Sequence, residues 1–234
     1  MENLKLEIRD KSLITGLNNL EELVEYNQFP IYIGCTDKDI NEDLKANLKF
    51  MICKDSGCIQ SFFLLPLNIL YSGKFAEALG EKWKKHHQKF CQFINNNCNN
   101  NILEVGGSNG YLAREFFEIN NSDIKWTIIE PNLSDKPVKH KNINFIENYF
   151  DRNLKFEKGR TVVHSHVFEH LYKPLNFLSD ISNYLEDKGR HIFSIPNLPM
   201  YLDNNFSNTI NFEHTFYFTQ ELIEYLAARF KFKI

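Results

Sequence analysis

One stretch of the chain has the residue types and spacing of a ligand-binding turn. The apolar run Ile102–Val105 is followed at once by Gly106 and Gly107, and Gly110 precedes a segment with helical apolar spacing. Glycines let a backbone turn sharply and come close to a bound molecule. This pattern predicts a strand, a turn and a helix in an α/β sheet, with a ligand held at the carboxyl end of the strand.

Two carboxylates flank this turn and indicate the chemistry of the ligand. Glu104 comes just before the glycines, and Glu130 ends the next apolar run, where a carboxylate can bind ribose hydroxyls. A dinucleotide is disfavoured, because the G-x-G-x-x-G spacing is absent and Glu104 would repel a pyrophosphate. S-adenosylmethionine has an ammonium group, a ribose and no phosphate, so it is the expected cofactor.

Histidines supply the candidates for a general base, since an imidazole titrates near neutral pH. His214 follows Glu213 ahead of the last expected helix, so a carboxylate can orient this imidazole. The alternative is that His214 only caps that loop. His170 is a second candidate, and His166 is expected at the end of a strand, beside the cofactor. Of the other five, surface positions are expected for His86 and His87, packing positions for His164 and His191, and a polar loop for His140.

Strands and helices alternate from Ile102 onward, which predicts a Rossmann-like, doubly wound and mostly parallel sheet with helices on both faces. Strands are expected at 102–106, 124–130, 143–147, 161–166, 189–195 and 230–234, and helices at 109–120, 172–187 and 218–229.

The first part of the chain is expected to form a small separate module. Two apolar runs, 48–53 and 58–63, flank a loop with Asp, Ser and Gly, which predicts a β-hairpin. A strand entering a turn is expected at 29–35 and a long helix at 73–97. The polar stretch that ends this helix places the domain boundary between residues 1–98 and 99–234.

The second half of the chain resembles the class I S-adenosylmethionine-dependent methyltransferases. Glu104–Gly110 looks like their first motif, Ile129–Pro131 like their second, and His166–Pro174 like the segment after their fourth strand. The resemblance implies that Glu104, Gly106, Gly107 and Gly110 hold the methionyl part and that Glu130 holds the ribose. It also implies that Asn148, Tyr149 and Phe150 flank the adenine.

A narrower resemblance is to sugar C-methyltransferases with an N-terminal zinc-binding module. Cys53–Gln60 is similar to the second cysteine pair of that module, but the first pair is reduced to Cys35. Structural zinc takes four ligands, so zinc is not expected and the hairpin is expected to be held by packing. The same resemblance implies that Tyr71 contacts substrate, with an interior tyrosine as the alternative.

That family also carries a Y-x-E-H-x-x-Y-x-S segment whose Tyr, Glu and His form its proposed catalytic group. Glu213 and His214 are retained here, but Asn211 stands in place of the tyrosine. The resemblance implies that Glu213 and His214 are catalytic, whereas the missing tyrosine favours an acceptor oxygen over a carbon.

Composition excludes several other classes. The chain of 234 residues has a net charge of -3, which disfavours a nucleic-acid partner. The start of the chain has no signal-peptide pattern, and its apolar runs are too short to cross a membrane. Its five cysteines are odd in number, which favours reduced thiols in a cytoplasmic protein.

The leading hypothesis is therefore an S-adenosylmethionine-dependent O-methyltransferase for a sugar-linked or phosphorylated small molecule, in surface-polysaccharide tailoring. A sugar C-methyltransferase and a catalytically degenerate cofactor-binding protein are the alternatives. Class I methyltransferases usually add a final antiparallel strand, which is expected to be missing because the sequence ends at Ile234. The exposed sheet edge could pair with a second chain, so a homodimer is an open alternative.

Overall fold

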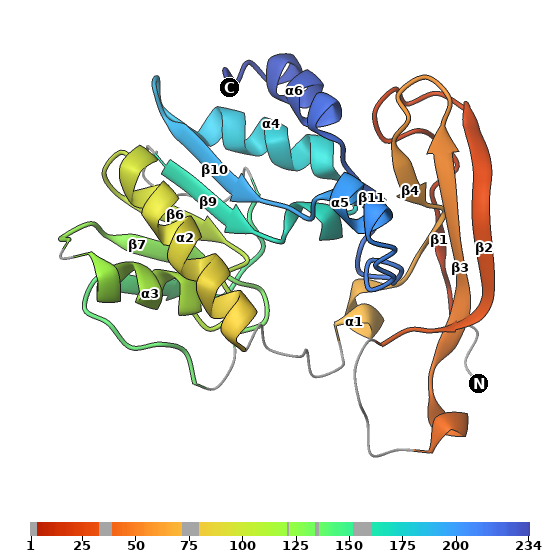
Figure 1. Cartoon of the computed structure of the whole chain (residues 1–234), viewed down its shortest axis with the longest axis horizontal. Coiled ribbons are helices and arrows are strands. Elements are labelled where there is room, and N and C mark those ends of the chain that lie inside the picture. The colour runs from red at the N-terminus through yellow and green to blue at the C-terminus, as the bar shows by residue number, and fades with distance from the viewer. Residues whose placement is uncertain (1–3, 33–38, 72–79, 121, 134–135, 152–160) are drawn as a thin grey trace. The chain divides into compact units, whose positions relative to one another are not determined.

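The computed structural model describes residues 4–32, 39–71, 80–120, 122–133, 136–151 and 161–234 (Figure 1). Contacts divide the chain into two compact units. The antiparallel-sheet unit comprises Met1–Glu77, Glu169–Leu175 and Pro196–Ile234, and the parallel-sheet unit comprises Ala78–Phe168 and Asn176–Ile195. This division lies elsewhere than the expected domain boundary at residue 98, which stays a prediction.

Five parallel strands form the sheet of the parallel-sheet unit, as the α/β prediction requires. They are β6 (Ile102–Val105), β7 (Trp126–Ile129), β8 (Ile143–Ile146), β9 (Thr161–Ser165) and β10 (Arg190–Ser194). Their order is β10-β9-β6-β7-β8. From the central strand β6 the chain first adds β7 and β8 on one side and then crosses back to add β9 and β10 on the other. The reversal between β6 and β9 is the place where open α/β sheets bind ligands, at the carboxyl ends of the strands.

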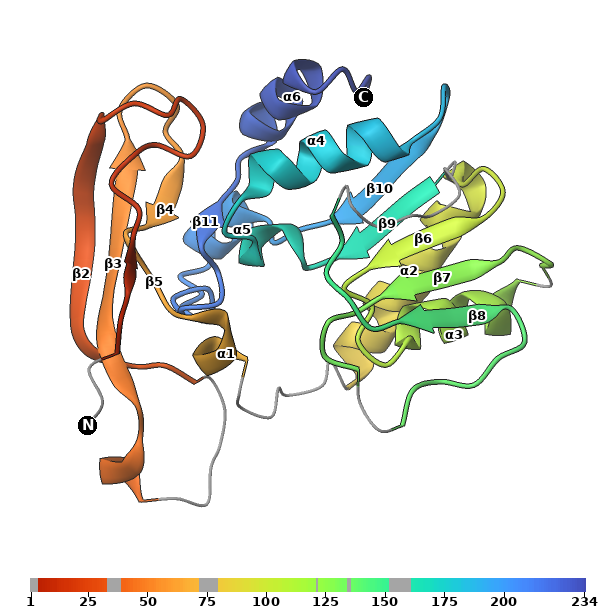
Figure 2. The same cartoon turned by 180° about the vertical axis from the view of Figure 1, so that it is seen from behind.

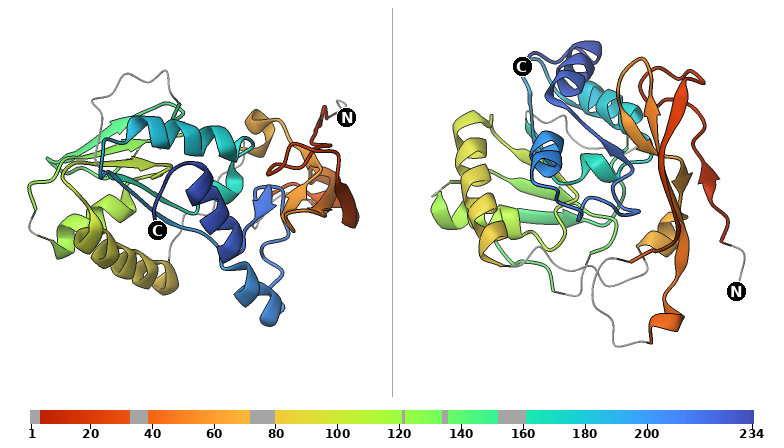
Figure 3. Two further views of the ribbon diagram at one scale, coloured as in Figure 1. Left: turned by 90° about the horizontal axis from the view of Figure 1, so that it is seen from above. Right: turned by 45° about the vertical axis from the view of Figure 1, so that its right-hand side comes forward.

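Helices cover both faces of this sheet. Figure 3 shows α2 (Glu81–Asn97) and α3 (Tyr111–Ile119) on one face and α4 (Pro174–Tyr184) on the other. The core under α2 and α3 is almost entirely apolar and consists of Phe90, Cys91, Ile94, Ile102, Leu112, Ala113, Phe116, Trp126, Ile128, Val163 and Ile192. The helix expected at 73–97 is found from Glu81 onward, and residues 73–79 lie outside the described residues.

A second sheet, with strand order β11-β4-β3-β2, forms the antiparallel-sheet unit (Figure 2). Its strands are β2 (Leu20–Pro30), β3 (Lys45–Cys53), β4 (Ile59–Ser61) and β11 (Phe216–Tyr217), and β1 (Glu7–Ile8) pairs separately with β5 (Phe63–Leu64). The antiparallel pairing of β3 with β4 confirms the predicted hairpin. Of the segment 29–35, Phe29 and Pro30 end strand β2 and Ile31 lies in a bend, which confirms the first part of the expected strand and turn, while residues 33–35 lie outside the described part of the chain.

The remaining elements are short, except for the last helix. They are α1 (Leu67–Leu70), α5 (Leu198–Asp203), α6 (Gln220–Arg229) and the 3-10 turns η1 (Ile40–Glu42) and η2 (Phe168–His170). The strand expected at 230–234 is wrong, because these residues form no strand and Lys231 has a positive φ of 64° that breaks an extended run. None of the helices in the described ranges is long and apolar enough to cross a membrane.

The core of the antiparallel-sheet unit joins segments from both ends of the chain. It consists of Ile31, Ala46, Leu48, Phe50, Leu65, Leu70 and Phe212, and Tyr71 and Tyr172 pack against it. Strand β11 extends the sheet by pairing with β4, with Phe216 opposite Gln60 and Tyr217 opposite Ile59. The loop that carries Glu213 and His214 is thereby fixed to the sheet built by the first part of the chain.

Candidate functional site

Glu104 lies in β6 beneath the glycine turn and is 2% exposed. Its Oε2 accepts a 2.8 Å hydrogen bond from the indole Nε1 of Trp126. A Cβ on Gly107 would come within 2.8 Å of the Glu104 carboxyl carbon, so the turn lies directly against this carboxyl group. Burial raises the pKa of Glu104 from its ordinary value of 4.5 to about 7, although the Trp126 hydrogen bond acts in the opposite direction.

The turn requires glycine at both of its ends. Gly106 has a φ of 71° and Gly110, at the start of α3, has a φ of 83°, a left-handed conformation that other residues rarely adopt. A Cβ on Gly110 would also come within 2.7 Å of the Phe145 ring. The three glycines therefore allow the close approach of backbone and sheet that the sequence predicted.

Glu130 follows β7 and connects two loops through its carboxylate. Its Oε2 accepts a 2.9 Å hydrogen bond from the backbone N–H of Ser108 in the glycine turn, and its Oε1 accepts a 3.0 Å bond from Asn132. Each carboxylate oxygen can accept more than one hydrogen bond. Glu130 is thus held beside the turn, with capacity left for the hydroxyls of a ribose.

These residues fit S-adenosylmethionine. A carboxyl group as buried as that of Glu104 ionises readily only beside a positive charge, and the methionyl ammonium would supply one. Glu130, at the end of the next strand, would face the ribose end. Residues 104, 106, 107, 110 and 130 therefore lie together at one corner of the sheet, as the sequence indicated.

The three residues expected beside the adenine differ in their surroundings. Asn148 is exposed and accepts a hydrogen bond from the backbone of Tyr149, which is 55% exposed. Phe150 is half-buried and packs against Phe177 and Tyr184, with ring centroids 5.7 and 6.1 Å apart.

The carboxyl ends of β9 and β10 carry a group that the sequence did not single out. His86 lies on α2, and its Nε2 is 3.1 Å from Ser165 Oγ and 3.4 Å from Ser194 Oγ. The expectation of a surface position for His86 and His87 is wrong, since both are half-buried. Burial lowers the pKa of His86 to about 4, with help from the neighbouring His166, so this imidazole is neutral at pH 7.

His166 follows β9, where the sequence placed it. Its ring centroid is 5.0 Å from that of Trp83 and 5.4 Å from that of His86. The spacing of Trp83, His86 and Phe90 along α2 puts them on one helix face, so the apolar residues three positions before and four positions after His86 were the signal that could have found it. His164 and His191, expected as packing residues, are paired with their Nε2 atoms 2.9 Å apart.

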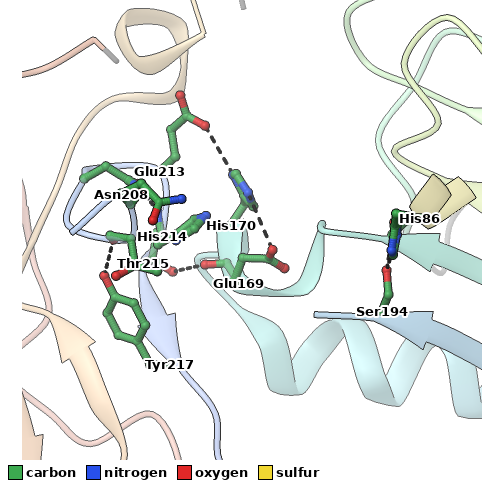
Figure 4. A network of polar contacts seen from close by, with 12 residues as sticks. His86, Glu169, His170, Ser194, Asn208, Glu213, His214, Thr215 and Tyr217 are labelled. Carbon is green, nitrogen blue, oxygen red and sulfur yellow. Dashed lines mark hydrogen bonds and ion pairs between the residues drawn. The ribbon is translucent and has the colours of Figure 1, made fainter. Parts of the chain in front are cut away.

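Two carboxylates and two histidines meet in the antiparallel-sheet unit; we call Glu169, His170, Glu213 and His214 the Glu–His cluster (Figure 4). His170 lies between both acids, with Nε2 4.0 Å from Glu169 and Nδ1 3.8 Å from Glu213. The rings of His170 and His214 are 5.1 Å apart and nearly perpendicular, at 82°. Burial raises the pKa of Glu213 above its ordinary value.

Hydrogen bonds to Thr215 hold the two segments of the cluster together. The Thr215 backbone N–H donates to the Glu169 carbonyl at 2.8 Å, and its Oγ1 donates to the Leu171 carbonyl at 2.7 Å. The Thr215 carbonyl accepts from Arg9 Nη1 at 2.9 Å, while Arg9 Nη2 donates to the Tyr172 carbonyl at 2.9 Å. Arg9 thus stabilises the position of both segments. No local sequence signal identifies it, because its partners are backbone atoms far along the chain.

Asn211 has a structural part in this loop. Its Oδ1 accepts a 2.7 Å hydrogen bond from the His214 backbone N–H, and its Nδ2 donates to the Asn208 carbonyl. Tyr71, the expected substrate contact, is half-buried against the core of the same unit. A small pocket in this unit has Glu169 and His214 among its walls, and its other lining residues are Pro196, Leu198, Thr209, Phe216, Tyr217 and Phe218.

Comparison with known proteins identifies the family. A family model described as the methyltransferase domain matches residues 75–234, which include the glycine turn, Glu130 and the whole Glu–His cluster. A search of curated proteins finds no match.

Solved methyltransferases resemble the chain only distantly. The 1,6-didemethyltoxoflavin-N1-methyltransferase of Burkholderia thailandensis, solved with 1,6-didemethyltoxoflavin and S-adenosylhomocysteine, is 14% identical, with 64% of this chain and 69% of that chain covered and a TM-score of 0.48. An O-methyltransferase family protein of Burkholderia thailandensis is 9% identical, with 63% and 50% covered and a TM-score of 0.49. The N-methyltransferase NodS of Bradyrhizobium japonicum is 12% identical, with 62% and 80% covered and a TM-score of 0.44.

The chain spans less than two thirds of the length of several such structures, and these low identities indicate no acceptor. The family match covers more than half of the sequence and includes the glycine turn with its two acids. The chain belongs to the methyltransferase domain family and is a class I S-adenosylmethionine-dependent methyltransferase.

Proposed function

We propose that the protein transfers a methyl group to a hydroxyl oxygen of a small molecule, with the Glu–His cluster receiving the acceptor's proton. The observation that carries the proposal is the meeting of two imidazoles and two carboxylates from segments far apart in the sequence. Such a group can accept a proton near neutral pH. An isolated carboxylate or lysine is a less effective proton acceptor at that pH.

The bound cofactor supplies an electrophilic methyl group on a sulfonium. In the proposed reaction the acceptor oxygen forms the new bond to the methyl carbon, the carbon–sulfur bond breaks, and the hydroxyl proton passes to His214. Glu213 and His170 stabilise the charge that this proton brings, since Glu213 Oε2 is 3.8 Å from His170 Nδ1 and the His170 and His214 rings are 5.1 Å apart. Positioning of the acceptor supplies a further rate gain.

An oxygen acceptor is favoured over carbon by the role of Asn211. Its amide is already bonded to the His214 backbone and to Asn208, so it supports the loop and offers no phenol to a carbon acid. The C-methyltransferase alternative therefore lacks the tyrosine that the family resemblance would require. The acceptors that we propose are sugar-linked or phosphorylated precursors of surface polysaccharides, methylated in the cytoplasm. This choice depends on family analogy alone.

The test is methyl transfer by the purified full chain, using methyl-labelled cofactor and a panel of nucleotide sugars and phosphorylated precursors. For an acceptor that is turned over, His214→Gln is expected to lower the rate by about 10²–10⁴-fold, while binding of S-adenosylhomocysteine is unchanged. The matched control is His140→Gln, because His140 is an exposed histidine of the parallel-sheet unit.

Three outcomes would contradict the proposal. Full activity of His214→Gln would remove the proton-transfer role, and a label found on carbon would establish the C-methyltransferase alternative. Tight binding of S-adenosylhomocysteine without turnover of any acceptor in the panel would favour the degenerate cofactor-binding protein.

A further inference from the structure

We propose that Glu169, His170 and His214 form a binding site for a divalent transition-metal ion. Each of these residues offers one ligand atom, and the three atoms lie within 4.8 Å of one another. Two imidazole nitrogens and one carboxylate oxygen are a donor set that transition metals use in proteins. The inference rests on the same side chains as the proposed function and gives His214 a second role, that of a metal ligand, and metal binding can be measured without any acceptor.

The three ligands come close to the spacing that a metal requires. Metal–nitrogen and metal–oxygen bonds of about 2.0–2.2 Å place neighbouring donors roughly 3–3.5 Å apart around one ion. His170 Nε2 is 4.0 Å from Glu169 Oε1, and the two histidine rings are nearly perpendicular with centroids 5.1 Å apart. Side-chain movements of about 1 Å therefore suffice to bring the donors onto a common centre.

Glu213 has the position of an outer-sphere residue. A histidine that binds a metal through one ring nitrogen usually donates its other N–H to a carboxylate, which fixes the tautomer and the ring orientation. Glu213 Oε2 is 3.8 Å from His170 Nδ1, on the opposite side of the ring from Glu169. In this arrangement Glu169 binds the metal and Glu213 orients His170, so both acids of the Glu–His cluster have a role.

The charge of the cluster also favours a cation. Glu169 is 2% exposed, and burying a carboxylate is costly unless a positive charge or several hydrogen bonds compensate it. Glu169 and the second carboxylate, Glu213, lie 4.0 and 3.8 Å from the two ring nitrogens of His170. A bound divalent ion would offset both carboxylates together, which a single protonated imidazole would not.

The backbone around the ligands is already fixed. The Thr215 backbone N–H donates to the Glu169 carbonyl. This bond joins the segment that carries Glu169 and His170 to the segment that carries His214. Strand β11, which follows at once, is paired with β4. Glu169 and His214 line the same small pocket, whose walls include Pro196, Leu198, Phe216 and Phe218. Two of the three proposed ligands therefore face one common space.

The donor set selects the class of metal. Nitrogen ligands favour Zn²⁺, Co²⁺, Ni²⁺ or Fe²⁺ over Mg²⁺ and Ca²⁺, which prefer oxygen. Three protein ligands leave coordination positions open, which a water or a hydroxyl oxygen can take. With a metal bound, the ring nitrogen of His214 that holds the ion could not also receive a proton, so the proton-accepting role proposed for His214 applies to the chain without the ion.

The experiment uses the full chain after treatment with a chelator and dialysis. Titration with Zn²⁺ by calorimetry, and with Co²⁺ by its visible absorption, is expected to show one ion bound per chain. Glu169→Gln, His170→Gln and His214→Gln should each weaken binding by at least about 10-fold, and Glu213→Gln by about 10-fold. His140→Gln should leave the affinity unchanged.

A second variant separates this site from the cysteine hairpin. Cys53 and Cys58 are buried thiols and could bind Zn²⁺ elsewhere in the same unit. In the double variant Cys53→Ser/Cys58→Ser the ion should still bind with one ion per chain. Circular dichroism and S-adenosylhomocysteine binding show whether each variant is folded, so that loss of metal is not confused with loss of structure.

The inference is overturned if no stoichiometric ion binds, or if binding is lost in the cysteine variant and kept in Glu169→Gln and His214→Gln. Methyl transfer that depends on His214 in a chain that binds no metal would overturn this inference and leave the proposed function intact. One bound ion that requires Glu169 and His214, without methyl transfer to any acceptor, supports the metal site and contradicts only the proposed function.

Discussion

The indole N–H of Trp126 donates a 2.8 Å hydrogen bond to Glu104, a carboxyl group that is 2% exposed beneath the glycine turn. This contact joins Glu104 on β6 to Trp126 on the neighbouring strand β7 and so holds the carboxyl group in place. It also lowers the pKa of Glu104, which burial raises to about 7. Burial beside the glycine turn therefore opposes the ionisation of this carboxyl group.

The first prediction concerns stability and pH. The folded-state pKa of Glu104 is about 7 and its ordinary value is 4.5, so the folded protein binds more protons than the unfolded chain between these values. Ionisation of Glu104 is therefore expected to destabilise the fold progressively as pH rises from about 4.5 to 7, by about 3 kcal/mol in all. Denaturant unfolding of Glu104→Gln should show a smaller loss of stability over this range; an unchanged pH profile would contradict the assignment.

The second prediction concerns cofactor affinity. Because the methionyl ammonium favours the ionised form of Glu104, binding of S-adenosylhomocysteine is expected to release a proton below pH 7. Its affinity should rise with pH by up to about tenfold per unit and level off above pH 7. Calorimetry in buffers of different ionisation enthalpy counts the released protons. Glu104→Gln should bind more weakly and without this pH dependence, whereas equal proton release in the variant would argue against it.

The third prediction compares two glycines with similar backbones. Gly57 and Gly110 both have positive φ, at 67° and 83°, but only at Gly110 would a Cβ meet a neighbour, the Phe145 ring at 2.7 Å. Alanine at either position is expected to cost about 1–2 kcal/mol for the left-handed backbone. Gly110→Ala should cost more than Gly57→Ala in urea unfolding, and it alone should weaken S-adenosylhomocysteine binding. Equal losses in both variants would show that the contact with Phe145 does not matter.

The fourth prediction concerns Arg9. Its guanidinium donates to the carbonyls of Thr215 and Tyr172, and burial lowers its pKa only to about 10, so it stays charged at pH 7. Arg9→Met leaves these carbonyls without that donor and is expected to cost about 2–4 kcal/mol, since hydrogen bonds to charged groups contribute about 1.5–3 kcal/mol each. Thermal unfolding measures the loss, and metal affinity should fall with it.

The control for this variant is Arg114→Met, because Arg114 is a largely exposed arginine whose ion pair with Glu118 contributes little. Its unfolding temperature should stay within about 1–2 °C of the wild type. An Arg9→Met protein as stable as this control would show that the Glu–His cluster does not depend on Arg9.

Some elements of the fold were predictable because their signals are local. The hairpin of β3 and β4 follows from two apolar runs around a turn, and the five parallel strands follow from short apolar runs between helical segments. Strand β2 was missed because most of its residues are exposed, so that no alternation of apolar and polar residues stands out. The strand expected at 230–234 failed although Phe230, Phe232 and Ile234 alternate with lysines, because Lys231 adopts a positive φ directly after the end of α6.

The sequence by itself predicted the glycine turn with its two neighbouring acids and indicated the methyltransferase family. Glu104 and the glycines are contiguous, and Glu130 ends the adjoining parallel strand, so strand pairing alone brings these residues together. Only the tertiary structure decided that Glu169 and His170 meet Glu213 and His214, that Arg9 fastens both segments, and that His86 lies against Ser165. The physical reason is that these contacts join residues far apart in the chain. They depend on backbone carbonyls and on the packing of helix faces, and neither leaves a recognisable residue pattern in the sequence.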